Sequence, residues 1–397
     1  MASPWWQRAV VYQLYPRSFS DSNGDGVGDL RGVVDRLDYL EWLGVGGLWL
    51  NPIHPSPNAD WGYDVADYCD VHPELGTLAD ADRLIAAANR RGIEIVLDLV
   101  PGHTSDEHPW FSDASKRGWY IWSDEAREGT SVFGGPSWTE RDGAWYFHAF
   151  HAKQPNVNWL NDEVRDAFDR ILRFWFDRGV AGFRIDVSHD FVRDGEGHVR
   201  RDLTHDVLRS WRRIADEYDP PRVLIGETWV HDLAELMTFY GQGDELHMAF
   251  NFPFLFASLE ELGAVAARTE ALLPEGAWPI WALSNHDVVR FPTRMCDGDE
   301  AKVRRALRIL LSLRGTPVLY QGDELGLEQV AVPPDRIRDV AERDGCRTPI
   351  PWTRSGGWRE PWLPLGDTSR NVEDERSDPA SVLNLVRELI AARSTHV

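Results

Sequence analysis

Short apolar runs alternate with amphipathic segments along most of the chain. Eight of the runs are rich in β-branched or aromatic residues and have the length of buried strands: residues 10–15, 47–50, 93–99, 182–186, 223–227, 246–252, 279–283 and 316–320. Apolar positions at helical spacing fill residues 33–43, 80–91, 164–178, 199–218, 302–314 and 380–393. This alternation predicts a parallel sheet, and eight units favour a closed (β/α)8 TIM barrel of the α/β class. No Gly-x-Gly-x-x-Gly motif follows the first run, which disfavours a doubly wound dinucleotide-binding fold.

Two long stretches interrupt this rhythm. The first begins after the third predicted strand and is rich in Gly, Trp, Asp and His. We therefore expect residues 1–101 and 161–397 to form the barrel, and residues 102–160 to form a small inserted lobe. The second irregular stretch, residues 326–368, follows the eighth strand. Long loops at the carboxyl ends of barrel strands are where this fold places its active sites.

Composition narrows the function classes. The formal net charge of -22 disfavours nucleic acid and anionic membrane surfaces as partners and predicts a neutral or cationic substrate. Cys69, Cys296 and Cys346 are far apart in the sequence, and their odd number argues against a disulfide framework. There is no signal-peptide pattern and no apolar run that approaches the ~20 residues of a membrane helix. These features predict reduced thiols and a cytoplasmic location, and they leave the oligomeric state open.

Acidic residues stand at the ends of three predicted strands. Asp186, Glu227 and Asp287 should converge at one face of a closed barrel, where buried carboxylates are costly unless they are paired. A structural ion-pair ring with Arg184 and Arg290 is the alternative interpretation. Glycoside hydrolysis is the chemistry that requires paired carboxylates, because one carboxylate attacks the anomeric carbon and another, kept protonated, donates its proton to the leaving oxygen. Arg184 shares a strand face with Asp186 and would keep it ionised.

Seven segments, in this order, resemble the signature regions of glycoside hydrolase family 13, the α-amylase family. The similarity is greatest to its α-glucosidase and oligo-1,6-glucosidase branch and spans essentially the whole chain. The segments are residues 98–105 (DLVPGHTS), 154–158 (QPNVN), 182–187 (GFRIDV), 226–228 (GET), 285–287 (NHD), 315–322 (GTPVLYQG) and 347–352 (RTPIPW).

The resemblance implies a retaining, exo-acting α-glucosidase that removes terminal glucose from short α-glucosides. It implies that Asp186 is the nucleophile, Glu227 the general acid/base and Asp287 the carboxylate that binds the sugar 2- and 3-hydroxyls. It also implies a set of substrate-binding residues around the terminal glucose: Asp60, Tyr63, His103, Arg184, His286 and Arg347. In that set Arg347 would pair with Asp60 and close the pocket.

A second resemblance concerns an acidic loop near the N-terminus. Oxygen-bearing side chains at Asp21, Asn23, Asp25 and Asp29 alternate around the backbone carbonyl of Val27, a donor set that hard cations prefer. The loop resembles the cation loop of the same branch, which implies a structural Ca²⁺, with Mg²⁺ as the alternative, and no organic cofactor. An Asx-rich turn without metal is the other interpretation.

Three alternatives to an α-glucosidase are considered at this stage. A transglucosylase or a sucrose-acting enzyme would use the same double displacement with another acceptor. A non-catalytic relative is disfavoured because the three carboxylates are intact, and a metal-dependent barrel hydrolase because His103 and His286 are too few as ligands.

The sequence also departs from the family pattern. Gly102 replaces the usual Asn, we expect no C-terminal β domain after the barrel, and Val187 bears only weakly on linkage preference.

Overall fold

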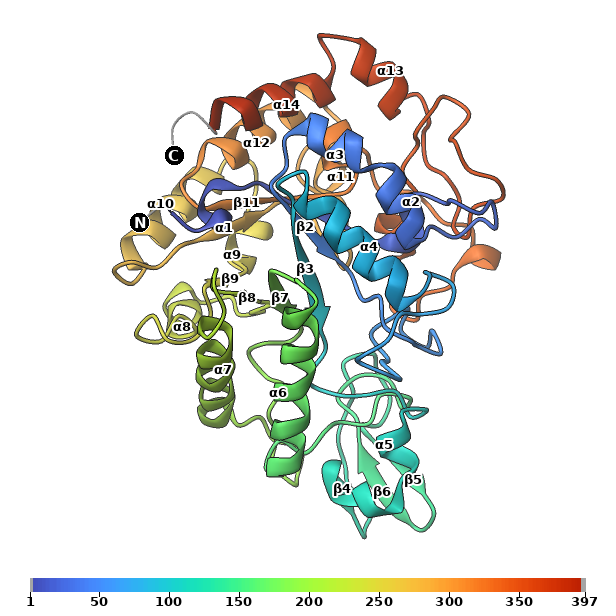
Figure 1. Ribbon diagram of the computed structural model, residues 1–397, viewed down its shortest axis with the longest axis vertical. Coiled ribbons are helices and arrows are strands. Elements are labelled where there is room, and N and C mark those ends of the chain that lie inside the picture. Colours follow the sequence, from blue (N-terminus) through green and yellow to red (C-terminus); the bar gives the residue numbers. More distant parts are fainter. Residues whose placement is uncertain (1–2, 394–397) are drawn as a thin grey trace.

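The computed structural model describes residues 3–393, and its centre is a nearly closed barrel of eight parallel strands (Figure 1). The strands are β1 (Val11–Leu14), β2 (Gly47–Leu50), β3 (Glu94–Leu99), β7 (Gly182–Ile185), β8 (Val223–Gly226), β9 (Met248–Ala249), β10 (Ile280–Ala282) and β11 (Thr316–Tyr320). Their order is β10-β11-β1-β2-β3-β7-β8-β9. A parallel bridge between Phe250 and Ile280 joins the two outer strands. The predicted (β/α)8 barrel is confirmed.

Strand side chains divide between two cores with a period of two. Val11, Val96 and Val223 belong to a cluster made largely of strand side chains. Tyr12 and Leu97, the next residues along β1 and β3, belong to the larger cluster that also contains the apolar helix faces. Successive strand side chains point to opposite faces, so the first cluster fills the barrel and the second packs the helices against it.

The main barrel helices begin and end where local chemistry requires. Thr77 and Asp80 form a capping box at the start of α4, and Asn161 caps α6. Gly44, in the left-handed conformation, ends α3. The helices are α1 (Trp5–Arg8), α2 (Leu30–Asp35), α3 (Leu37–Leu43), α4 (Leu78–Asn89), α5 (Pro109–Ser112), α6 (Asp162–Asp177), α7 (Arg201–Asp216), α8 (Leu233–Thr238), α9 (Phe252–Leu255), α10 (Leu262–Leu272), α11 (Phe291–Arg294), α12 (Glu300–Ser312), α13 (Val372–Ser377) and α14 (Val382–Arg393).

Two elements differ from the sequence prediction. The single helix expected over 33–43 is two helices, because the Asp29 side chain caps α2 at Gly32 and Arg36 leaves the helical conformation between α2 and α3. The strand expected over 246–252 is reduced to the two residues of β9, because Asn251 caps α9 and turns the chain away from the barrel.

Residues 102–160, here called the lobe, contain a three-stranded antiparallel sheet in the order β4 (Trp122–Ser123), β6 (Ala144–Phe147), β5 (Trp138–Arg141). This sheet projects below the barrel in Figure 1. The lobe is joined to the end of β3 by Asn156, whose Nδ2 donates to the carbonyl oxygen of Gly102 at 2.8 Å, and by Trp159, whose Nε1 donates to that of Pro101 at 2.9 Å. These two hydrogen bonds attach the lobe without an asparagine side chain at position 102.

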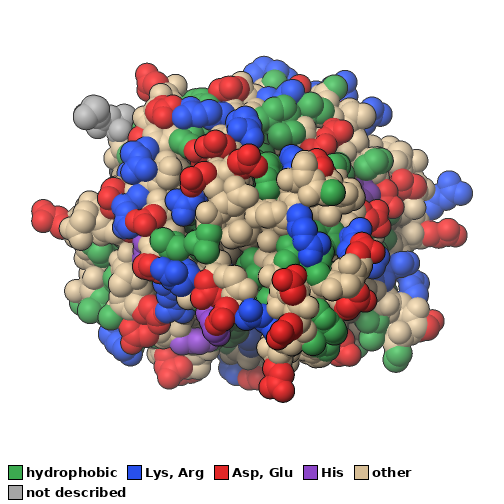
Figure 2. Space-filling model, turned by 90° about the horizontal axis from the view of Figure 1, so that it is seen from below, with side chains coloured by type: hydrophobic (Ala, Val, Ile, Leu, Met, Phe, Trp, Pro, Cys, Tyr) green, Lys and Arg blue, Asp and Glu red, His purple; other side chains and the backbone are tan. Residues whose placement is uncertain are grey.

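The face that carries the lobe has no patch of a single charge. Asp and Glu side chains are interspersed with Lys and Arg side chains over it (Figure 2). Within residues 3–393, no helix has the length and apolar character needed to cross a membrane.

Candidate active site

Four acidic residues meet around one buried arginine at the carboxyl end of the barrel. Arg184 lies in β7, in register with Asp98 of β3. Its Nη1 donates to Asp98 Oδ1 at 2.7 Å and to Asp186 Oδ1 at 2.8 Å, and its Nη2 lies 2.9 Å from Glu227 Oε2. Asp287, after β10, lines the same cavity. The sequence analysis did not single out Asp98, which lies within a strand rather than after it.

Burial controls the protonation of the two carboxyls nearest the cavity centre. It raises the pKa of Asp186 and of Glu227 well above their usual values, while the Arg184 guanidinium acts in the opposite direction on both. Burial therefore favours a protonated carboxyl in this pair at neutral pH, while the Arg184 cation favours an ionised one.

The backbone after Asp186 is held in a strained conformation. Val187 has a φ of 45°, which is rare for a β-branched residue, and its N–H donates to Glu227 Oε2 at 2.8 Å. This hydrogen bond links the strand end that carries Asp186 to the Glu227 side chain, so it fixes the two carboxyls relative to each other.

Asp287 has the opposite electrostatic environment. Burial would raise its pKa, but His286 and the guanidinium groups of Arg343 and Arg347 hold the pKa of this carboxyl well below its usual range. Arg343 Nη1 lies 3.0 Å and Arg347 Nη2 3.1 Å from Asp287 Oδ1. Asp287 is therefore a permanent anion, whereas Asp186 and Glu227 are titratable.

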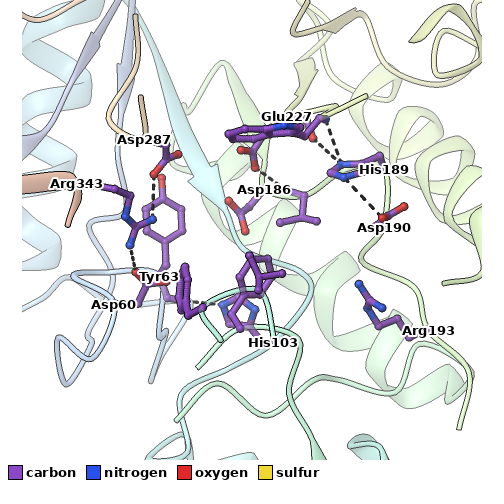
Figure 3. Close-up of a pocket in the computed structure, with 15 residues that line it drawn as sticks. Asp60, Tyr63, His103, Asp186, His189, Asp190, Arg193, Glu227, Asp287 and Arg343 are labelled. Atoms are coloured by element: carbon purple, nitrogen blue, oxygen red, sulfur yellow. Dashed lines mark hydrogen bonds and ion pairs between the residues drawn. The ribbon is translucent and has the colours of Figure 1, made fainter. Parts of the chain in front are cut away.

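These residues surround a cavity of about 390 Å³ (Figure 3). Asp60, Tyr63 and Arg343 lie at one side of it, and His189, Asp190 and Arg193 at the other, with Asp186 and Glu227 between them. The full lining is Asp60, Tyr63, His103, Val132, Phe133, Phe150, Asp186, Val187, His189, Asp190, Arg193, Glu227, Trp229, Asp287 and Arg343.

The side with Asp60 is densely hydrogen-bonded. Gln154 Nε2 donates to Asp60 Oδ2 at 2.9 Å and lies 3.0 Å from Nε2 of His103. The His103 ring also contacts the Tyr63 carbonyl oxygen at 3.1 Å, and burial lowers its pKa to about 4. Its Nδ1 is buried and has no hydrogen-bond partner within residues 3–393.

His286 lies behind Tyr63 rather than in the cavity wall. Its ring stacks on Tyr63 at 5.3 Å between centroids, and its Nδ1 lies 2.9 Å from Nε2 of Gln13. Its Nε2 lies 3.2 Å from Asp287 Oδ2. His286 is thus placed to orient Tyr63 and Asp287.

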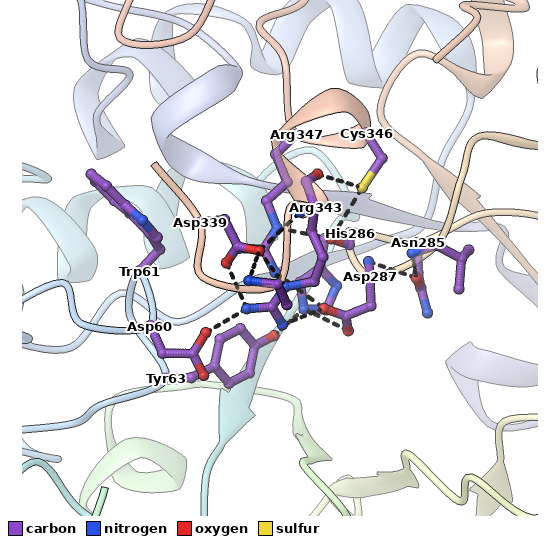
Figure 4. Close-up of polar contacts among 12 residues, drawn as sticks. Asp60, Trp61, Tyr63, Asn285, His286, Asp287, Asp339, Arg343, Cys346 and Arg347 are labelled. Carbon is purple, nitrogen blue, oxygen red and sulfur yellow. Dashed lines mark hydrogen bonds and ion pairs between the residues drawn. The ribbon is translucent and has the colours of Figure 1, made fainter. Parts of the chain in front are cut away.

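One pairing predicted from the sequence is wrong. Arg347, expected to pair with Asp60, instead contacts Asp287 and Asp339, and Arg343 Nη2 is the group that contacts Asp60 Oδ1, at 2.5 Å (Figure 4). Both arginines are held by Asp339, whose side chain is fully buried and accepts from Arg343 Nε at 2.9 Å. The reason is geometric: the short helical turn from 343 to 346 places Arg343 over the cavity and directs Arg347 beneath it.

Sequence reasoning also missed Gln154 and Arg193, which come from irregular segments. Gln154 stands in a quoted motif, so that motif could have identified it. No periodicity or motif marks Arg193.

The acidic loop is a set of tight turns with oxygen donors. Asp21 accepts from the N–H groups of Gly24 and Gly26 at 2.7 and 2.8 Å, and Asp25 Oδ1 accepts from Val27 N at 2.8 Å. Asp29 is buried and caps α2. No three His, Cys, Asp or Glu side chains in residues 3–393 converge as a metal site. Each carboxylate keeps lone pairs beyond these bonds, so the oxygen-only donor set is compatible with a hard cation.

Comparison with known proteins gives a consistent result. Residues 13–397 match the α-amylase catalytic domain. The chain is 36% identical to a probable α-glucosidase of Rhizobium meliloti over 99% of this chain and 83% of that protein. It is 34% identical to the oligo-1,6-glucosidase of Parageobacillus thermoglucosidasius over 100% and 84%. The crystal structure of an α-glucosyl transfer enzyme matches with a TM-score of 0.93 and 38% identity, over 99% of this chain and 84% of that chain. The crystal structure of a trehalulose synthase matches with a TM-score of 0.92 and 31% identity, over 99% of this chain and 85% of that chain.

Proposed function

Because the chain belongs to the α-amylase family and is a glycoside hydrolase, we propose that it is a retaining exo-acting α-glucosidase with Asp186 as nucleophile. The observation that carries this proposal is the pair formed by Asp186 and Glu227. Both carboxyls contact the same guanidinium, since Asp186 Oδ1 lies 2.8 Å from Arg184 Nη1 and Glu227 Oε2 lies 2.9 Å from Arg184 Nη2, so they face the cavity side by side. An inverting enzyme needs about 6.5–9.5 Å between its carboxyls to admit a water molecule.

The reaction then proceeds in two displacements. The ionised Asp186 attacks the anomeric carbon of the terminal glucose, and the protonated Glu227 donates its proton to the leaving glycosidic oxygen. In the second step Glu227, now a carboxylate, removes a proton from water, which attacks the anomeric carbon from the face that the aglycone left while the bond to Asp186 breaks and its carboxylate is released. Two inversions return the α configuration.

The remaining polar residues support recognition of one terminal glucose. Asp287 is a fixed anion suited to bind two sugar hydroxyls and to stabilise positive charge at the anomeric centre. Asp60 and Arg343 close the far side of the cavity, and Tyr63 offers a ring on which the sugar can stack. A cavity closed behind the glucose favours removal of one unit from a chain end.

A second candidate is transfer of the glucosyl group to an acceptor other than water. The observation that favours it is the side chain of Trp229 in the cavity wall beside His189, to whose Nδ1 the Trp229 backbone N–H donates. An aromatic ring offers water few hydrogen bonds and would favour an organic acceptor. The similar α-glucosyl transfer enzyme and trehalulose synthase are named for such reactions.

The acidic loop is proposed to hold a structural Ca²⁺, with Mg²⁺ as the alternative. Asp21, Asn23, Asp25, Asp29 and the Val27 carbonyl would supply oxygen ligands, and Asp29 also accepts hydrogen bonds from Ser22, which holds it in the loop. The cation would neutralise the carboxylates of this loop and takes no part in the reaction above. A cytoplasmic location is proposed because all three cysteines are free thiols.

The test of the function is hydrolysis of p-nitrophenyl α-D-glucopyranoside, with ¹H NMR of the first glucose released. Wild type and the exposed control Asp124→Ala are expected to release α-glucose first, and Asp186→Ala to lose activity by about 10³-fold or more. β-Glucose as the first product, or equal activity in Asp186→Ala, would contradict the assignment.

A further inference from the structure

Arg193 is a cation in the cavity wall that lacks a carboxylate partner. Its Nη1 donates to the Gly197 carbonyl oxygen at 2.9 Å, and its guanidinium lies 5.6 Å from the centre of the Phe147 ring. Within residues 3–393, no Asp or Glu oxygen lies within the 4.0 Å of an ion pair with it. Arg184 and Arg343, by contrast, each contact three carboxylates. Arg193 therefore retains donors for a ligand.

The acidic groups near Arg193 are engaged elsewhere. Asp190 Oδ1 accepts from Arg201 Nε at 3.1 Å. Asp194 Oδ1 accepts from the backbone N–H groups of Glu196 and His198 at 2.9 and 3.0 Å. Both acids lie close enough to act on the charge of Arg193, but burial outweighs them and lowers its pKa. The guanidinium thus loses solvation without gaining a counter-ion, a cost that a bound anion would offset.

The cavity that Arg193 lines has aromatic rings on both of its sides. Trp229, from the loop after β8, donates its backbone N–H to His189 Nδ1 and so lies on the side of Arg193. Phe133 of the lobe lies 5.3 Å from the Arg343 guanidinium, and Phe150 lies 5.5 Å from the His103 ring, both on the opposite side. Figure 3 shows Arg193 on the side of Asp186 and Glu227 opposite to Asp60 and Arg343. Glucose bound against Asp60 would direct its glycosidic oxygen, and the group attached to it, toward this side.

We propose that this side of the cavity binds an apolar aglycone that carries a carboxylate, and that Arg193 is the residue that recognises the carboxylate. The inference rests on the proposed α-glucosidase function and specifies its substrate class. It departs from the neutral or cationic substrate expected from the net charge of -22, because Arg193 is a local cation in the cavity wall. A guanidinium can donate two parallel hydrogen bonds to a carboxylate, and the partial burial of Arg193 strengthens this pairing because less water competes for it. Asp60 selects the terminal glucose of the substrate, and Arg193 selects the carboxylate of its aglycone.

The experiment compares two matched substrates, 4-carboxyphenyl and 4-carbamoylphenyl α-D-glucopyranoside, which have nearly the same shape and differ in charge. The ratio of their kcat/KM values is measured for wild type, Arg193→Gln and Arg193→Lys, so general losses of activity and the difference in leaving groups cancel. Arg200→Gln is the control, because Arg200 pairs with Asp202 and does not line the cavity. The 3-carboxyphenyl and 3-carbamoylphenyl pair tests a second position of the carboxylate on the phenyl ring.

For at least one pair we expect Arg193→Gln to lower the acid-to-amide ratio by about ten-fold, Arg193→Lys to lower it less, and Arg200→Gln to leave it unchanged. Equal ratios in wild type and Arg193→Gln for both pairs, with hydrolysis intact, would overturn this inference and leave the proposed function standing. Failure of wild type to hydrolyse the four glucosides while it hydrolyses p-nitrophenyl α-D-glucopyranoside would overturn this inference alone, and failure with all five would overturn the proposed function and this inference with it.

Discussion

Replacing Arg343 by methionine should weaken glucose binding far more than it slows the chemical step. Arg343 contacts Asp60, Asp287 and Asp339, and all four side chains are at most 15% exposed. Removing one partner of a buried ion pair costs about 3–5 kcal/mol. Here Arg347 still contacts Asp287 and Asp339, so only Asp60 loses its cation, and we expect the loss to be about 2–3 kcal/mol.

This free energy corresponds to a decrease in kcat/KM of about 30- to 150-fold. Most of it should appear as a higher KM, because Arg184 still holds Asp186 and Glu227 in place. The assay is steady-state hydrolysis of p-nitrophenyl α-D-glucopyranoside, with thermal unfolding of each variant. Arg336→Met is the matched control, because it removes an exposed arginine of the same loop that contacts only a backbone oxygen.

A double-mutant cycle with Asp60→Ala tests whether Arg343 acts through Asp60. If Arg343 acts through Asp60, the double variant should lose little more than either single variant, because both remove the same interaction. Additive losses, or a larger KM effect from Arg347→Met than from Arg343→Met, would refute the assignment of Arg343 as the partner of Asp60.

Three further predictions test other parts of the molecule. Glu227→Gln should abolish the alkaline limb of the kcat/KM profile, which reflects loss of the Glu227 proton, and lower kcat by about 10²–10⁴-fold; an unchanged alkaline limb would contradict its role as acid. Millimolar Ca²⁺ should raise the Tm of wild type but not of the Asp21→Asn, Asp25→Asn double variant, and an equal rise in both would remove the loop as the site. Asn156→Ala should lower the free energy of unfolding by about 1–3 kcal/mol, measured by urea denaturation, because it removes the side chain that donates to Gly102.

The sequence was sufficient to predict the barrel and the convergence of its carboxylates. Strands buried on both faces appear as continuous apolar runs, and this signal does not depend on distant contacts. Asp186 and Glu227 follow such runs directly, so the closure of the barrel brings them together whatever the loops do. The helix predicted over 33–43 begins earlier because Asp29 caps it and breaks at Arg36, and the strand predicted over 246–252 ends early because Asn251 caps α9.

The features of the site that could not be predicted from the sequence lie in the loops. Arg343 and Arg347 stand four residues apart in one irregular stretch, and either could reach Asp60 in an extended chain. The choice depends on Asp339, which is buried beneath them, and on the conformation of the turn that carries them. Such a choice arises from tertiary packing, and no local pattern encodes it.

The two sides of the cavity therefore impose different kinds of selectivity. On the glucose side, the charges of Asp60, Asp287 and Arg343 are paired with one another, so a ligand must replace an existing network with an equivalent one. A site of this kind rejects sugars that leave a buried polar group unpaired. On the other side, the Trp229 ring and Arg193 impose shape and charge but few directional bonds. The glucosyl donor should accordingly be narrowly defined, whereas the leaving group and the acceptor depend on the less constrained side, and with them the balance between hydrolysis and transfer.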